Sequence, residues 1–244
     1  MLRFLIVIIF VILFLVLSLP VLLIEWIVGK FNKHAKDVVC QKIIQTAFKF
    51  ILWFCGTKLD IYGEENLPTD TPALYVGNHR SIFDILIFYT RVKSLTGIIS
   101  KKEMNIIPIF NIWMRNINCY FLDRENIKDG LKMVLYAIDS IKKGIGILIF
   151  PEGTRNKEEG SVLPFKGGSF KIAEKSKCDV VPFAIINSAA IFENHKPALK
   201  SSHVILVIGE PIKTADFTKD DFKELPDKAR EEVIRLHNSK VDEL

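Results

Sequence analysis

The sequence predicts an α/β protein with a mostly parallel central sheet flanked by helices, preceded by an N-terminal membrane-associated helical hairpin. Two observations lead to this fold class. The first 55 residues are apolar at most positions, as membrane-associated helices are. From residue 57 onward, short apolar runs alternate with helical stretches, which is typical of a largely parallel sheet. We therefore predict a membrane-anchoring hairpin over residues 1–56 and an α/β domain over residues 57–244.

The hairpin contains two apolar segments. Residues 4–24 are long enough to cross a hydrocarbon core as a helix, and they suit a cleaved signal peptide less well because no small-residue cleavage site follows. Lys30, Lys33 and Lys36 come next, so the positive-inside rule places the downstream domain on the cytoplasmic face of a membrane. Residues 38–55 carry a narrow polar stripe that suits either the membrane interface or packing against the first helix; its members are Gln41, Lys42, Gln45 and Lys49.

The elements of the α/β domain follow from its apolar runs and the turn residues between them. A short strand at residues 59–62 precedes a turn at 63–68. Further strands are predicted at residues 73–76, 96–100, 119–122, 146–150, 180–186 and 204–208. Helices are predicted at residues 82–90, 109–115, 127–142 and 219–237, and another is expected after the glycine-rich loop at 164–168.

Net charge and residue composition indicate which kinds of partner and site the protein has. The formal net charge of +5 suits an anionic substrate or surface. Nucleic acid is not a predicted partner, because the aromatic residues do not interleave with the basic ones as stacking platforms do. The four cysteines form no C-x-x-C pair and lie far apart, which favours reduced core or membrane residues over disulfides or zinc ligands; they are Cys40, Cys55, Cys119 and Cys178. Reduced cysteines fit a catalytic domain that faces the cytoplasm.

The predicted site centres on the segment Asn78-His79-Arg80-Ser81-Ile82-Phe83-Asp84, which follows the strand at 73–76. On a continuous helix His79 and Asp84 would lie about 140° apart, since each residue turns about 100°. They can meet if His79 lies on the loop and Asp84 in the first turn of the next helix, begun by Ser81 as a capping box. Asp84 would then orient His79 as a general base. A helix cap with an incidental histidine fits the same residues.

Polar side chains also follow three other predicted strands. Because parallel strands end at one edge of a sheet, where ligands bind, we expect these side chains to share one site. The cations among them predict an anionic substrate, most simply a phosphate. The residues are Lys101 and Lys102 after the strand at 96–100, Asp123 and Arg124 after 119–122, and Glu152, Gly153, Thr154 and Arg155 after 146–150.

Other site types are less well supported. The loop at 164–168, with Lys166, fits either an anion cradle at a helix start or a plain turn with a solvated lysine. No G-x-S-x-G motif is present, which disfavours a serine hydrolase. No second histidine lies at metal-ligand spacing near His79, so no metal site is predicted.

Four motifs occur in a fixed order along the α/β domain: Asn78-His79-(x4)-Asp84, Phe121-Leu122-Asp123-Arg124, Phe150-Pro151-Glu152-Gly153-Thr154-Arg155 and Val181-Pro182-Phe183. They resemble the four sequence blocks of the glycerolipid acyltransferases, specifically the 1-acyl-sn-glycerol-3-phosphate (lysophosphatidate) acyltransferase branch. The resemblance runs from about residue 62 to residue 212 and includes the turn at 63–68 and the loop at 165–168. One departure is Asn111, where many relatives carry glycine.

The resemblance implies that His79 is the general base and that Asp84 orients it. The base would remove a proton from the free sn-2 hydroxyl of lysophosphatidate, whose oxygen attacks the thioester of acyl-CoA or acyl-carrier protein to give phosphatidate, without a cofactor. The resemblance also implies phosphate binding by Arg124, Glu152, Gly153, Thr154 and Arg155, with Lys101 as a further contact. For Lys166, Gly168 and Pro182 it implies a place in the acyl site or its loop.

Alternative functions keep part of this scheme. The same chemistry on glycerol 3-phosphate, another lysophospholipid or an aminolipid fits the same residues. A membrane-bound lipid-binding protein without turnover is a hypothesis of another class, and the His79–Asp84 pair argues against it. Both acyl donors and any acyl-chain length are compatible with the sequence.

Overall fold

The centre of the molecule is a seven-stranded sheet in the order β1-β7-β6-β2-β5-β3-β4. A computed structural model describes all residues, 1–244. Neighbouring strands are parallel except for β6 and β7, which confirms the predicted fold class. Each observed strand begins and ends within one residue of its prediction: β1 (Lys58–Tyr62), β2 (Leu74–Gly77), β3 (Thr96–Lys101), β4 (Tyr120–Leu122), β5 (Gly146–Ile149), β6 (Val180–Ile186) and β7 (His203–Ile208).

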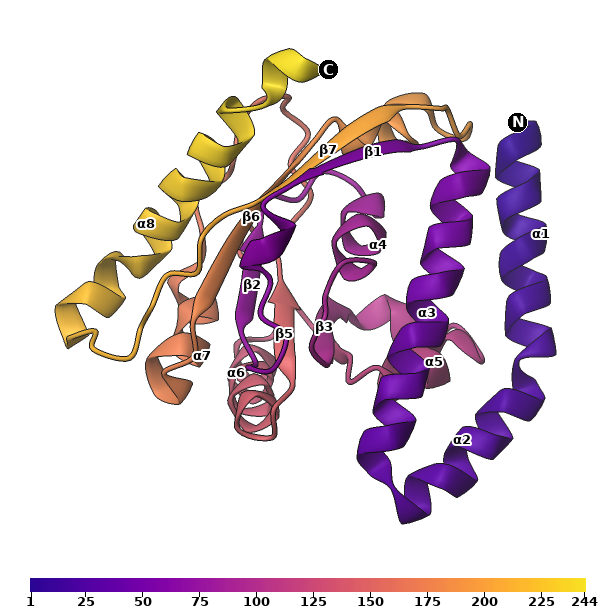
Figure 1. Cartoon of the computed structure of the whole chain (residues 1–244), viewed down its shortest axis with the longest axis horizontal. Helices are drawn as coiled ribbons and strands as arrows, with labels where there is room; N and C mark the ends of the chain where they lie inside the picture. Colours follow the sequence, from indigo (N-terminus) through magenta and orange to yellow (C-terminus); the bar gives the residue numbers. More distant parts are fainter.

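Helices cover both faces of the sheet, so the domain has three layers (Figure 1). The first face packs against α3 (Lys33–Cys55), α4 (Phe83–Tyr89) and α5 (Phe110–Asn116). The opposite face packs against α6 (Ile127–Lys142), α7 (Gly167–Ser176) and α8 (Lys219–Asn238). Strands β2, β5 and β6 are buried along their whole length, as expected of strands covered on both sides.

The first apolar segment is two helices, so the prediction of one helix over residues 4–24 was wrong. Helix α1 (Leu2–Leu17) and helix α2 (Leu19–Phe31) meet at an angle of 47°. Pro20, in the first turn of α2, has no N–H to continue the helix ladder. At the bend, the Ser18 hydroxyl donates to the Leu15 carbonyl at 3.0 Å and accepts from the Trp113 indole N–H at 2.9 Å. The bend is therefore tied to α5 of the α/β domain.

Helix α3 packs against α1, as one of the two predictions had it, and its polar stripe has a further role. The Gln41 amide donates to the Ser94 carbonyl at 2.9 Å and accepts from the Thr96 N–H at 2.9 Å. The Gln45 amide donates to two backbone carbonyls, that of Tyr89 at the end of α4 and that of Val92 in the loop after it. Lys42 is exposed. Because both glutamines bond the backbone of the α/β domain, α3 is a docked part of that domain as well as a partner of α1.

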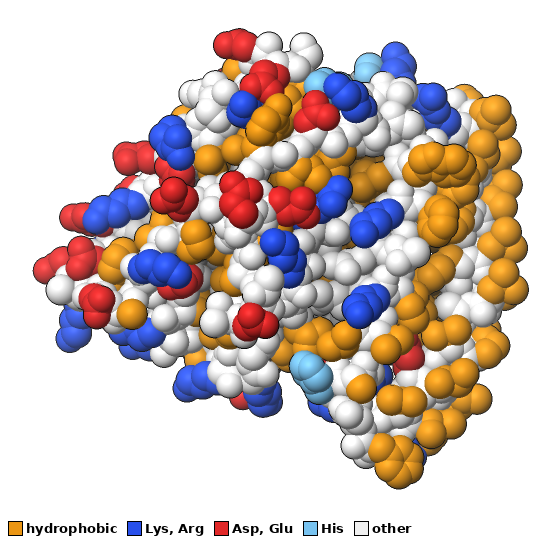
Figure 2. Space-filling model, viewed as in Figure 1, with side chains coloured by type: hydrophobic (Ala, Val, Ile, Leu, Met, Phe, Trp, Pro, Cys, Tyr) orange, Lys and Arg blue, Asp and Glu red, His pale blue; other side chains and the backbone are white.

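Large apolar side chains cover the outer surface of the N-terminal helices, at the right of the space-filling view (Figure 2). By length and hydropathy, α3 fits a membrane span, whereas α1 and α2 fit one only as a bent pair. A contiguous apolar surface of this kind marks a contact with another apolar phase or partner. Its most exposed members on α1 and α2 include Leu2, Leu5, Ile12, Leu17, Leu23, Ile24, Trp26 and Phe31.

Candidate active site

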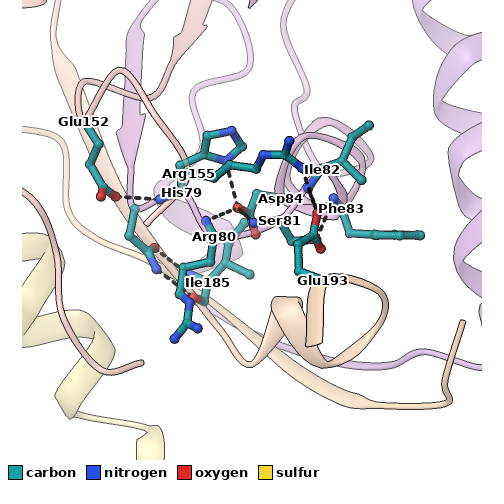
Figure 3. A network of polar contacts seen from close by, with 11 residues as sticks. His79, Arg80, Ser81, Ile82, Phe83, Asp84, Glu152, Arg155, Ile185 and Glu193 are labelled. Carbon is teal, nitrogen blue, oxygen red and sulfur yellow. Dashed lines mark hydrogen bonds and ion pairs between the residues drawn. The ribbon is translucent and has the colours of Figure 1, made fainter. Parts of the chain in front are cut away.

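His79 and Asp84 form a buried pair at the carboxyl end of β2. The Nδ1 atom of His79 lies 2.9 Å from Oδ2 of Asp84, and the two residues are 5% and 1% exposed. The same oxygen accepts the backbone N–H groups of Arg80 and Ser81, each at 2.7 Å. When Nδ1 carries the proton shared with Asp84, the lone pair of Nε2 is on the side of the ring that points away from the carboxylate (Figure 3). The pair thus has the geometry of an oriented general base.

The turn that brings Asp84 to His79 is half of the predicted capping box. The Asp84 carboxylate reaches back to the Ser81 N–H, as predicted, but the Ser81 hydroxyl accepts from the Phe83 N–H at 3.0 Å instead of from residue 84. Helix α4 begins at Phe83, and its N-cap Ile82 offers no side-chain cap. His79 therefore lies on the loop and Asp84 in the first helical turn, as the i,i+5 spacing required.

An aromatic ring supports the imidazole. The ring of Phe150, which directly follows β5, stacks on His79 with centroids 4.2 Å apart and an interplanar angle of 17°. Phe183 on β6 meets Phe150 edge-on at 5.9 Å. The imidazole of His79 is therefore held between a carboxylate on its edge and an apolar ring on its face.

Buried polar side chains join the loops on either side of this pair. The Asn78 amide exchanges two hydrogen bonds with the backbone of Ile185 on β6, both at 2.8 Å, and so extends the pairing of β2 and β6 past the end of β2. The Glu152 carboxylate accepts the His79 N–H at 2.7 Å and the Leu163 N–H at 3.2 Å. Burial raises the pKa of Glu152 to about 7.

Two cations lie against Gly153, and a third, Arg155, lies near one of them. The Arg124 guanidinium donates to the Gly153 carbonyl at 2.7 Å, and burial together with the nearby Arg155 lowers the pKa of Arg124. The Lys166 ammonium lies where a side chain on Gly153 would be, since a Cβ there would come within 2.5 Å of Nζ. Gly153 also has a φ of +73°, a left-handed conformation that favours glycine. Arg124, Arg155 and Lys166 thus form a cationic group able to bind a phosphate.

The remaining predicted site residues have different surroundings. Lys101, at the end of β3, is exposed and pairs with Glu103 at 3.1 Å. Thr154 is exposed beside Gly153, and Gly168 lies in the first turn of α7 with open space around it. Pro182 is buried within β6, opposite Val76 of β2. Thr154 thus lies at the cationic group because it is between Gly153 and Arg155 in the chain. Pro182 is part of the buried core.

One residue at the site was missed by sequence reasoning. Glu193 lies after the carboxyl end of β6 and bonds both Ser81 and Arg155 (Figure 3). The rule that polar residues after parallel strands share one edge could have found it, because β6 is parallel to β2. The pattern was missed because a short 3-10 helix, Ser188–Ala190, lies between the end of β6 and Glu193.

Neither a metal cluster nor a thiolate is placed at the site. No group of three or more His, Cys, Asp or Glu side chains is arranged to hold a metal ion. All four cysteines are buried and free, and burial raises the pKa of Cys119 to about 12. A thiol of such high pKa is a poor nucleophile near neutral pH.

A carboxylate-oriented imidazole and a cationic group on one α/β scaffold suit an enzyme that acts on an anionic substrate. The chain belongs to the acyltransferase family, because the family model described as Acyltransferase matches residues 58–186, more than half of the chain. This confirms the family predicted from the four motifs.

Individual relatives carry the name of the predicted branch. It is 28% identical over 210 residues to the 1-acyl-sn-glycerol-3-phosphate acyltransferase of Saccharomyces cerevisiae, covering 85% of this chain and 67% of the relative. It is 32% identical over 150 residues to the Borreliella burgdorferi protein of the same name, covering 62% and 60% of the two chains. The crystal structure of PlsC, the 1-acyl-sn-glycerophosphate (LPA) acyltransferase from Thermotoga maritima, matches 96% of this chain and 94% of its own with a TM-score of 0.80 and 25% identity.

Proposed function

We propose that this enzyme transfers a fatty acyl group from acyl-CoA or acyl-carrier protein to the sn-2 hydroxyl of 1-acyl-sn-glycerol 3-phosphate, giving phosphatidate. The observation that carries the proposal is the 2.9 Å contact between His79 and Asp84 beside a group of three cations. Such a site suits a substrate that presents a hydroxyl to a base and a phosphate to guanidinium groups. The names of the relatives support the same acceptor.

In the proposed reaction, Nε2 of His79 removes the hydroxyl proton as the oxygen bonds to the thioester carbonyl carbon. The carbon–sulfur bond then breaks, and the departing thiolate takes the proton from the imidazolium. Asp84 stabilises the imidazolium and holds the ring. Arg124, Arg155 and Lys166 bind the phosphate and so place the hydroxyl near His79.

The membrane location is part of the same proposal. Both acceptor and product carry acyl chains, so the site should open toward a bilayer. The exposed apolar surface of α1 and α2 suits insertion into such a bilayer. The first ring of α1, Phe4, stacks on Phe192 with centroids 5.9 Å apart, next to Glu193. A helix that inserts into lipid would therefore lie beside the segment that carries Glu193, with the α/β domain on the cytoplasmic face.

Replacement of His79 by alanine tests the proposal. Phosphatidate formation by the purified full-length protein in detergent, with lysophosphatidate and acyl-CoA or acyl-carrier protein, should fall by a factor of about 10²–10⁴, the usual contribution of a general base. His203→Ala is the matched control, because His203 pairs with Asp60 at 2.7 Å on the far strands of the sheet. Undiminished activity of a folded His79→Ala protein would refute the mechanism. A panel of other lysophospholipids, glycerol 3-phosphate and aminolipids would identify a different acceptor.

A further inference from the structure

Glu193 stands at the junction between the general-base turn and the cationic group. It begins the 3-10 helix Glu193–His195, outside residues 58–186 that the family model matches. Its side chain is 13% exposed. The preceding residue, Phe192, is packed on Phe4 of α1, which holds this segment in place.

The Glu193 carboxylate completes the start of α4. It accepts the Ser81 hydroxyl through Oε2 and the Ile82 N–H through Oε1 at 3.1 Å. No side chain within α4 reaches the Ile82 N–H, so Glu193 acts as the cap that the helix lacks. Because the Ser81 hydroxyl donates its hydrogen bond to Glu193, its oxygen lone pairs are free to accept the Phe83 N–H.

The same carboxylate fixes Arg155. Oε1 of Glu193 accepts from Nη1 of Arg155 at 2.9 Å. The Arg155 side chain is 48% exposed and lies close enough to Arg124 to be repelled by it. A guanidinium has five N–H donors, so the bond to Glu193 leaves most of the fork free for a phosphate. Without the carboxylate, repulsion and side-chain entropy would favour conformations of Arg155 that point into solvent.

We propose that Glu193 is a positioning residue that holds Arg155 by one nitrogen and ties it to the turn carrying His79 and Asp84. The bound phosphate of the acceptor and the imidazole that activates its hydroxyl are thereby held at a fixed position relative to each other. The role rests on the proposed function, since it requires an acceptor that bears a phosphate.

Steady-state kinetics of the full-length enzyme test this role. Glu193→Gln keeps an oxygen for the Ile82 N–H and an amide for the Ser81 hydroxyl but removes the charge. It should raise the KM for lysophosphatidate about two- to fivefold, the scale of a partly exposed ion pair, and leave the KM for the acyl donor unchanged. Glu232→Gln, which breaks an Arg235 ion pair on α8, is the matched control and should change neither constant.

A double-mutant cycle separates positioning from simple structural support. In an Arg155→Gln background, Glu193→Gln should cause no further rise in the acceptor KM. An equal rise in both backgrounds, or a lower kcat with an unchanged acceptor KM, would overturn the role. Absence of wild-type turnover would instead overturn the proposed function, and calorimetric binding of glycerol 3-phosphate to the same proteins would still show or refute the coupling between Glu193 and Arg155.

Discussion

The ring of Phe183 occupies the space that a side chain on Gly77 would need, since a Cβ there would lie 2.3 Å from the ring. The same ring stacks on Phe88 of α4 with centroids 3.9 Å apart and meets Phe150 edge-on. Phe150 in turn supports His79. A line of aromatic contacts thus connects the helix that carries Asp84 with the ring of the base, and the absence of a side chain at residue 77 permits it.

Gly77→Ala should therefore destabilise the protein. Overpacking a well-filled core of this kind costs about 1–3 kcal/mol, which denaturant unfolding would measure. Gly168→Ala is the contrasting change, because nothing lies within 4 Å of its Cβ and the residue is in the first turn of α7. Its stability should be unchanged or slightly higher. Equal stability of Gly77→Ala and wild type would show that the aromatic line can repack freely.

Asp84→Asn should lower kcat much more than it changes KM. All three hydrogen bonds go to Oδ2 of Asp84, and a neutral amide oxygen at that position accepts them more weakly. It also lacks the negative charge that stabilises an imidazolium, so His79 is held less firmly and its protonated form is less stable. The loss expected from removing such a carboxylate is about 10²–10⁴ in kcat. Asp60→Asn, which alters the half-buried partner of His203, should leave kcat unchanged.

Glu152 should make stability depend on pH. Burial raises its pKa from 4.5 to about 7 in the folded chain, so folding favours the protonated carboxyl. The stabilisation is complete below about pH 4.5 and is lost as the pH rises through about 7, with a range of at most about 3 kcal/mol. Glu152→Gln removes this titration while keeping an oxygen for the His79 N–H.

The effect of Glu152 is measured by unfolding both the wild type and Glu152→Gln at each pH. The free energy of unfolding of wild type, minus that of Glu152→Gln, should decrease between pH 5 and pH 8. A difference that is constant across this range would show that Glu152 is ionised at the same pH in the folded and unfolded chains.

Gln41→Ala should destabilise the whole protein and not only an N-terminal helix. The change leaves the buried Thr96 N–H without its partner, at a cost of about 1–3 kcal/mol for an unsatisfied group. It also removes one of the two hydrogen bonds to the Ser94 carbonyl, which keeps the Thr96 hydroxyl as a donor. Lys42→Ala alters the adjacent exposed residue and should have little effect. Amide exchange would locate the loss: faster exchange in β3 as well as in α3 is expected, and faster exchange in α3 alone would mean that the hairpin is independent of the domain.

Much of the fold was predictable because the apolar pattern of a strand buried on both faces is a local property. The runs at 146–150 and 180–186 contain little else, and both became central strands. The pattern for α1 and α2 was equally apolar. Pro20 breaks the helix ladder there, but the 47° bend is also held by a contact between Ser18 and Trp113, 95 residues later in the chain. Likewise, the polar residues of α3 gave no sign of whether they would face lipid or the backbone near Thr96.

The sequence by itself determined the alternation of strands and helices, the order of the motifs and the residues His79 and Asp84, because spacing and residue type are local. The tertiary structure decided what those residues meet. Phe150 stacks on His79, Lys166 lies against Gly153, and Glu193 reaches Ser81 from 112 residues away. Each of these contacts depends on which strand ends share an edge of the sheet, which is set by packing the whole chain into one core.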